Sequence, residues 1–145
     1  MIKYASDVMI ARPPGDVWPY LVEREKQALY TDVPMLPLTE GPWRVGSRAV
    51  LSFGRGPLGA RLTLEITSLD RDRRVAFTTV SHGGIRWEGE YRLDQVGETS
   101  TRLSQQGTIR FSGLWRLAEP IVGVEMRRNE LAELEGLKKV LETAP

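Results

Sequence analysis

The 145-residue sequence contains no cysteine and a single histidine, His82. Without cysteine there can be no disulfide bond, thiolate nucleophile or cysteine-ligated metal, and one histidine cannot form a histidine-rich metal site. No apolar run approaches the roughly 20 residues of a membrane-spanning helix. The N-terminus shows no secretory signal pattern. We therefore expect a cytoplasmic protein with no membrane span, no metal and no cofactor.

An excess of charge of either sign is also missing. The chain has 20 Lys and Arg against 19 Asp and Glu, a net charge of +1. Nucleic-acid-binding proteins usually concentrate positive charge on one surface, so we expect no nucleic-acid partner. Domains commonly run about 100 to 200 residues, so we expect residues 1–145 to form one domain. The 41% of hydrophobic residues is ordinary for a soluble globular protein.

The first 30 residues predict a strand followed by two short helices. Residues 2–10 alternate between apolar and polar side chains, as in a half-buried strand. Pro13 and Pro14 end this strand, and Pro14 suits the first position of a helix. Pro19 removes a helical hydrogen bond, so the first helix can run only a turn or two. Residues 22–30 are strong helix formers and predict its continuation.

The middle of the chain predicts an antiparallel sheet. Residues 31–46 contain three prolines and two glycines and indicate an irregular crossing segment. Residues 47–111 form a series of alternating strands separated by turn signals. One face of these strands is aromatic and aliphatic, with a few neutral polar side chains and no Asp, Glu, Lys or His: Leu62, Leu64, Ile66, Phe77, Thr79, Trp87, Tyr91, Gln105 and Phe111.

After Gly113 the apolar period changes to about 3.6 residues, which predicts a long amphipathic helix. Pro120 and Gly123 should kink its first half. Glu130 and Glu133 are expected to point mostly away from the apolar stripe. The stripe comprises Leu114, Leu117, Ile121, Val124, Leu131, Leu134, Leu137 and Leu141.

Three short motifs invite a chemical interpretation, and each fits a structural role better. "GRGPLG" (residues 54–59) matches a dinucleotide-binding glycine pattern, but a strand follows it where that site needs a helix, so we expect a hairpin. Ser81 and His82 lie in the turn "SHGG" and lack the local pattern of a catalytic serine. Glu88 and Glu90 are flanked by arginines on the outer face, where ion pairing is favoured over glycosidase chemistry.

The opening segment "VMIARPPGDVWPYL" (residues 8–21) resembles that of the START-like superfamily, in particular its bacterial polyketide cyclase/dehydrase and lipid transport family. Similar features are Trp43, Gly46, Tyr91 with Leu93, Gly107, and the closing "ELAELEGLKKVLE". The resemblance implies an α+β helix-grip fold: a curved antiparallel β-sheet wrapped around a long C-terminal α-helix, with two short helices after the first strand. A cavity between sheet and helix receives hydrophobic molecules in that family.

Combined with the aromatic inner face, the resemblance predicts a binding or carrier protein for a small hydrophobic molecule such as a lipid, sterol, quinone or polyketide-like compound. One alternative is a polyketide cyclase or dehydratase, with Tyr91 as the candidate acid and Gln105 or Thr79 orienting a carbonyl. Another is a protein of this fold that docks on a macromolecule. The expected ligand-binding residues are Phe53, Leu64, Phe77, Thr79, Trp87, Tyr91, Gln105, Phe111, Leu117, Ile121 and Val124.

Overall fold

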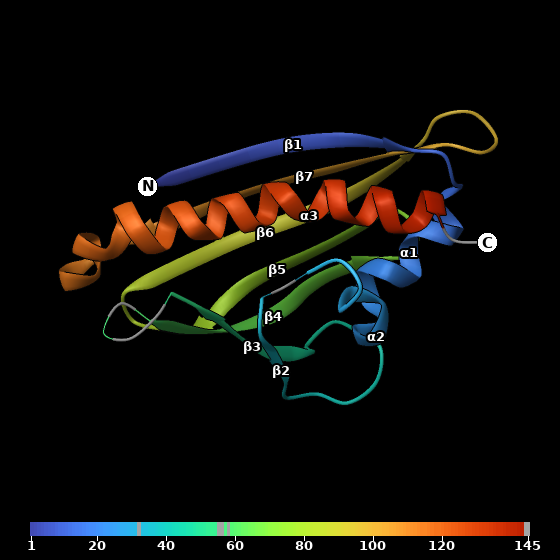
Figure 1. The fold of residues 1–145 in the computed structure, drawn as a ribbon. Coiled ribbons are helices and arrows are strands. Elements are labelled where there is room, and N and C mark those ends of the chain that lie inside the picture. The colour runs from blue at the N-terminus through green and yellow to red at the C-terminus, as the bar shows by residue number, and fades with distance from the viewer. Residues whose placement is uncertain (32, 55–56, 58, 144–145) are drawn as a thin grey trace.

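A computed structural model describes residues 1–31, 33–54, 57 and 59–143. The strands form one antiparallel sheet in the order β1-β7-β6-β5-β4-β3-β2, and the long C-terminal helix α3 crosses its concave side (Figure 1). This is the predicted α+β helix-grip fold. The strands are β1 (Ile2–Ile10), β2 (Met35–Pro37), β3 (Arg48–Phe53), β4 (Ala60–Asp70), β5 (Arg74–Ser81), β6 (Ile85–Gln95) and β7 (Thr101–Phe111); the α-helices are α1 (Pro14–Val22), α2 (Arg24–Gln27) and α3 (Val124–Thr143).

Helix α1 begins at Pro14, as the sequence predicts, and its buried side chains include Val17, Trp18 and Leu21. Glu23 then adopts an extended conformation and separates α1 from α2. Helix α2 has only four residues and no buried side chain; it confirms the predicted second short helix but is shorter than the run of helix formers over residues 22–30. Propensity alone does not sustain so short a helix, because most helical stability comes from packing an apolar face.

The segment at residues 31–46 is not entirely irregular, because Met35–Pro37 forms the short strand β2. It pairs with β3, with Met35 opposite Leu51 and Pro37 opposite Ala49. Strand β2 is the last in the sheet order, and an edge strand tolerates proline since one side of its backbone needs no ladder partner. Pairing with a neighbouring strand therefore overrides the proline-rich local sequence.

Two glycines let aromatic rings lie close to the concave face of the sheet. Gly107 is opposite Tyr4 and Gly89 in the strand register, and Gly89 is in turn opposite Phe77. A Cβ atom on Gly107 would overlap the hydroxyl of Tyr4, and one on Gly89 would lie 2.6 Å from Phe77 Cζ. The glycines therefore leave room for both rings, and the Tyr4 hydroxyl accepts a hydrogen bond from Trp87 Nε1 at 2.9 Å.

The C-terminal helical region differs from the prediction in its first third. Residues Gly113–Ala118 form a 3₁₀ helix and Glu119–Gly123 a π-helix, and α3 follows. The predicted disturbance around Pro120 is confirmed, and the whole region lies along the sheet in Figure 1. Because proline has no N–H to donate, the regular α-helical ladder fails here.

This irregular start changes which side chains face inward. In a 3₁₀ helix side chains three apart line up, and Ala118 is buried while Leu114 and Leu117 are exposed. From Ala118 onward the buried positions follow at steps of four: Val122, Met126, Glu130 and Leu134. The predicted stripe is therefore wrong at its first four positions, and the inward stripe of α3 includes a glutamate.

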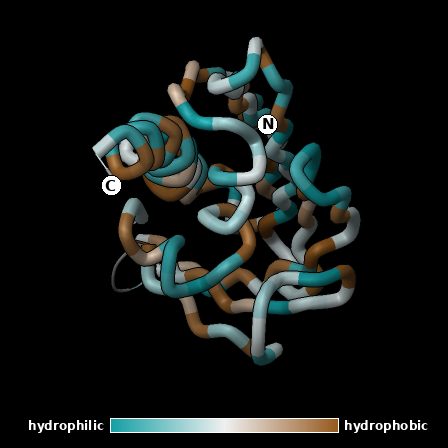
Figure 2. The backbone as a smooth tube through the Cα atoms, turned by 90° about the vertical axis from the view of Figure 1, so that its right-hand side faces the viewer, coloured by the Kyte–Doolittle hydropathy of each residue, from teal (hydrophilic) through white to brown (hydrophobic). Residues whose placement is uncertain are grey.

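Buried side chains form two clusters under α3. One includes Ile10, Val17, Leu103 and Leu137, and the other includes Tyr4, Phe53, Trp87, Ile109 and Met126. Phe77 packs against both clusters. Figure 2 shows the helix nearly end-on at the upper left, with the rest of the chain curving to its right and below it.

Candidate functional site

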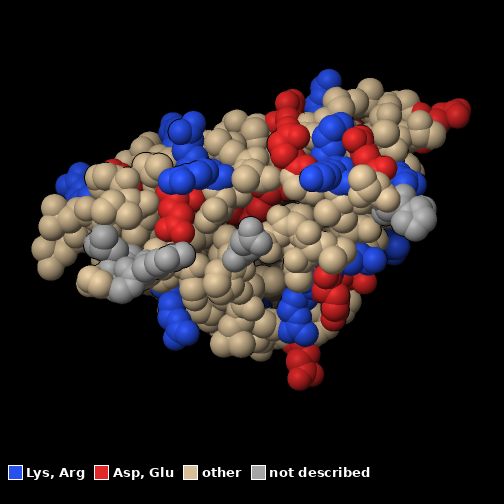
Figure 3. Space-filling model, viewed as in Figure 1, with Lys and Arg blue, Asp and Glu red and all other residues tan. Residues whose placement is uncertain are grey.

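A cavity of about 100 Å³ lies between the sheet, α3 and the chain that follows α2. Its apolar wall includes Leu64 and Ile66 of β4, Phe77 of β5 and Trp87 of β6, with members of both buried clusters. Figure 3 shows acidic atoms in a recess between α3 and the segments beneath it. A concave, mostly apolar space with a few polar groups is the usual form of a small-molecule site.

The polar groups of the cavity are gathered at the helix side. Glu130 and Glu133 are three residues apart on α3, so their side chains lie on adjacent positions of one helical face. The Tyr91 hydroxyl lies 2.8 Å from Glu130 Oε2 and 3.2 Å from Glu133 Oε2. Thr31 Oγ1 donates to Glu133 Oε1 at 2.8 Å. We call Tyr91, Glu130, Glu133 and Thr31 the acidic cluster.

Burial makes both glutamates weak acids. It raises the pKa of Glu130 well above its ordinary value of 4.5, the charge of Glu133 raises it further, and the Tyr91 hydrogen bond partly opposes these effects. Burial also raises the pKa of Glu133 to about 7, against hydrogen bonds from Thr31 and Tyr91. Burial and then the two carboxylates raise the pKa of Tyr91 well above its ordinary value. The site thus holds one carboxyl group, that of Glu133, with a pKa near neutrality, as acid–base sites require.

The structure brings some of the expected site residues to the cavity and places others elsewhere. Leu64, Phe77, Trp87 and Tyr91 line it. Phe53 and Phe111 are buried in the cluster beside it, and Thr79 Oγ1 accepts a hydrogen bond from the Trp87 backbone N–H. Gln105 is buried below α3, where its Nε2 donates to the Glu130 backbone carbonyl at 2.6 Å and to Ser6 Oγ at 3.0 Å.

The three residues expected from the start of the long helix do not face the cavity. Leu117, Ile121 and Val124 are 79%, 54% and 48% exposed. They lie on the outer side because the 3₁₀ and π-helical turns direct Ala118, Val122 and Met126 inward instead. Their assignment to the pocket wall is corrected by this geometry.

Sequence reasoning missed Glu130 and Glu133, which were expected to point away from the apolar stripe. Glu130 is only 3% exposed, and Glu133 is half-buried on the cavity wall. The spacing of Glu130 along the helix could have shown that it is buried, whereas its polarity could not. Glu130 follows Met126 by four residues and precedes Leu134 by four, so an α-helix places all three on one face. The prediction that the inner face of the strands carries no acidic side chain still holds, because both glutamates belong to α3.

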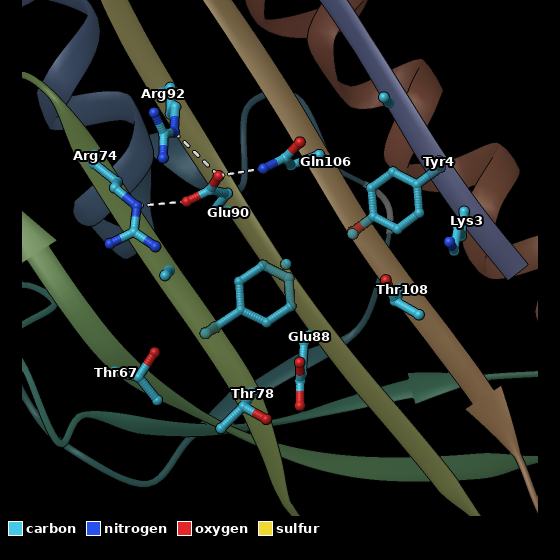
Figure 4. Close-up of a pocket in the computed structure, with 15 residues that line it drawn as sticks. Lys3, Tyr4, Thr67, Arg74, Thr78, Glu88, Glu90, Arg92, Gln106 and Thr108 are labelled. Atoms are coloured by element: carbon cyan, nitrogen blue, oxygen red, sulfur yellow. Dashed lines mark hydrogen bonds and ion pairs between the residues drawn. The ribbon is translucent and has the colours of Figure 1, made fainter. Parts of the chain in front are cut away.

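A larger hollow of about 920 Å³ lies on the opposite face of the sheet, and several of its polar side chains bond to one another (Figure 4). Arg74 and Arg92 both form ion pairs with Glu90, and Gln106 donates to the same carboxylate. The predicted pairing of Glu90 on the outer face is confirmed. Because this hollow is open and its Glu90 is paired with two arginines, we place the candidate site in the smaller cavity.

The remaining motifs have structural roles where the structure describes them. His82 Nδ1 accepts hydrogen bonds from the backbone N–H groups of Gly84 and Ile85, which stabilises the turn between β5 and β6. In "GRGPLG", residues 55, 56 and 58 lie outside the described residues; the flanking strands β3 and β4 are antiparallel, as a hairpin requires. The described residues contain no cluster of three or more His, Cys, Asp or Glu arranged for a metal ion.

Comparison with known proteins identifies the family. The family model described as "Polyketide cyclase / dehydrase and lipid transport" matches residues 1–142. The chain belongs to this family. A search of curated proteins found no match. Among the described residues of this polyketide cyclase/dehydrase family member, no helix is long and apolar enough to cross a membrane.

Solved structures similar to this family member share its fold at low sequence identity. Protein TTHA0849 from Thermus thermophilus is 17% identical, with a TM-score of 0.75 and coverage of 99% of this chain and 100% of the other. The Zhui aromatase/cyclase from Streptomyces sp. R1128 is 18% identical, with a TM-score of 0.73 and coverage of 97% and 93%. Protein MLL2253 from Mesorhizobium loti is 16% identical, with a TM-score of 0.72 and coverage of 99% of both chains.

Proposed function

We propose that this protein binds a small, largely apolar molecule that carries one polar group, in the cavity between the sheet and α3. The observation that carries the proposal is the acidic cluster at one side of an otherwise apolar cavity. Burying polar groups without partners costs free energy, and a ligand group that hydrogen-bonds to them recovers part of that cost. The apolar body of the ligand would contact Phe77 and Trp87.

The volume of the cavity favours a ligand with about one ring. A roughly 150 Å³ apolar cavity accommodates benzene, and pockets for drug-sized ligands run about 300–1,000 Å³. At about 100 Å³ this cavity is smaller than both, so it holds at most about one ring. Within the expected ligand classes, a single-ring quinone or a small polyketide-like compound therefore fits better than a sterol or a long-chain lipid.

A thermal-shift panel tests this proposal, with 2-phenylethanol, acetophenone and benzoquinone as single-ring probes and decanoate and a sterol as larger ones. A single-ring ligand at about 100 times its Kd adds about 2.7 kcal/mol and should raise the melting temperature by roughly 5–10 °C. The decanoate and sterol samples should show a smaller shift. No shift with any single-ring probe would contradict the proposal.

A variant that fills part of the cavity tests whether the ligand binds there. Ala49 is fully buried on its wall, so Ala49→Leu places three more carbon atoms there and should weaken the binding of 2-phenylethanol at least tenfold. Val50→Leu is the matched control, because Val50 is the next residue of β3 and its side chain points to the other face of the sheet. Equal affinities in the two variants would place the ligand elsewhere.

The pKa of Glu133 near neutrality supports a second function, the dehydration of a polyketide-like β-hydroxy ketone. Glu133 as base would remove the proton next to the carbonyl, and protonated Glu130 would donate a proton to the hydroxyl that leaves as water, giving the unsaturated ketone. The fold shared with an aromatase/cyclase is consistent with this function. We expect Glu133→Gln to lower the rate of water loss, monitored by mass spectrometry, roughly 100-fold or more. Equal rates in the variant and the unchanged protein would exclude Glu133 as the base.

A further inference from the structure

The acidic cluster contains more hydrogen-bond acceptors than its tyrosine can serve. The Tyr91 hydroxyl lies within hydrogen-bond distance of both Glu130 Oε2 and Glu133 Oε2, at 2.8 and 3.2 Å. A phenol carries one proton and can donate to only one of these oxygens at a time. One carboxyl group of the pair is therefore always without the Tyr91 donor.

No cationic side chain compensates the pair within the described part of the cavity. None of its described lining residues is Lys, Arg or His. Apart from the two glutamates themselves, the groups that interact with them are neutral: Tyr91 from β6, Tyr4 from β1, and Tyr30 and Thr31 from the chain after α2. Burial and the two carboxylates raise the pKa of each of these tyrosines, so they stay uncharged at neutral pH.

Two buried carboxyl groups without a cation need either bound protons or a positively charged ligand. An ammonium group has three donors and no acceptor, so it can bond to both carboxylates at once. The same cavity presents the rings of Phe77, Trp87 and Tyr91, and aromatic faces attract cations. A primary amine attached to a small apolar body matches both parts of the site.

We infer that the cavity selects a small hydrophobic amine, bound as its cation with the ammonium group between Glu130 and Glu133. This inference rests on the proposed function, which makes the cavity a ligand site, and it names the charge and chemical class of the ligand. Below about pH 7 binding is coupled to proton release, because the ammonium group replaces a proton held by the carboxyl pair.

Calorimetric titration with two probes of nearly equal shape tests the inference. 2-Phenylethylamine is a cation up to about pH 10, like other alkyl amines, and 2-phenylethanol is neutral. At about pH 8 the amine should bind at least tenfold more tightly than the alcohol. Its affinity should fall about tenfold for each pH unit below about 7, as the pair takes up the proton that competes with the ligand. The affinity of the alcohol should not fall in that range.

Two variants on the same helix complete the experiment. Glu133→Gln should weaken amine binding at least tenfold at about pH 8 and reduce its pH dependence, while Glu135→Gln, at an exposed position of α3, should bind like the unchanged protein. Binding of the alcohol as tightly as the amine at about pH 8 would overturn the inference and leave the proposed function intact. If neither probe binds, the inference fails, and the proposed function fails with it when acetophenone and benzoquinone also give no thermal shift.

Discussion

Replacing Glu133 with glutamine should raise the free energy of unfolding at about pH 8 by on the order of 3 kcal/mol and change it little at about pH 4.5. The pKa of Glu133 rises from 4.5 to about 7 on folding, so the folded state holds a proton that the unfolded state loses between these values. Stability contributed by that proton is present below about pH 4.5 and lost as the pH rises to about 7. Glutamine keeps a hydrogen-bonding side chain without the charge.

Urea denaturation from about pH 4 to 9 measures this effect as the difference in the free energy of unfolding between the variant and the unchanged protein. Glu90 and Glu142, whose pKa values are lowered, contribute stability that is lost only at more acidic pH, and they cancel in the difference. Glu135→Gln, an exposed change on the same helix, should stay within about 0.5 kcal/mol at every pH. A difference for Glu133→Gln that is the same at pH 4.5 and 8 would contradict the burial of a protonated carboxyl group.

Trp87→Ala should lower the free energy of unfolding by about 3–5 kcal/mol, since it removes a large aromatic side chain from the interior. Trp87 is 1% exposed and packs edge-on against Phe77, with ring centroids 4.9 Å apart, and against Phe53, at 5.7 Å. Its indole N–H donates to Tyr4 Oη. Because total stabilities are commonly about 5–15 kcal/mol, this single change removes a large share.

Tyr4→Phe separates the hydrogen bond from the packing. This variant keeps the ring of residue 4 and leaves the buried Trp87 N–H without its acceptor, which should cost about 1–3 kcal/mol. Chemical denaturation monitored by circular dichroism gives both values and does not depend on tryptophan fluorescence. A cost below about 1 kcal/mol for Trp87→Ala would show that the ring is not part of a close-packed interior.

The strands could be predicted because alternation reports directly on one buried face. Leu62, Leu64, Ile66, Trp87 and Phe111 are all buried, as their spacing indicates. Strand β2 could not be predicted in the same way, because it exists through pairing with β3 rather than through its own sequence. The end of α2 at Gln27 has a similar cause, since its helix-forming residues bury no apolar face.

The candidate site was harder to predict because it depends on the rotation of one helix. Sorting residues by polarity placed Glu130 on the outside, whereas its spacing from Met126 and Leu134 places it inside. The switch from 3₁₀ to π and then α-helix also rotates Leu117 and Ile121 outward. Tyr91 was predicted as a polar group in the cavity, but its carboxyl partners come from a helix about 40 residues later in the chain. The volume of the cavity depends on packing among several elements, which no local pattern contains.

We propose that ligands bind in the cavity beside the acidic cluster, and the four tryptophans allow a direct test. Trp43 and Trp87 line the cavity, whereas Trp18 and Trp115 do not. Each indole N–H gives its own signal in a ¹⁵N–¹H correlation spectrum, which Trp→Phe variants can assign. On titration with 2-phenylethanol, the account predicts shifts of the Trp43 and Trp87 signals with little change at Trp18 and Trp115. Shifts confined to Trp18 or Trp115, or no shift at saturating probe, would contradict it.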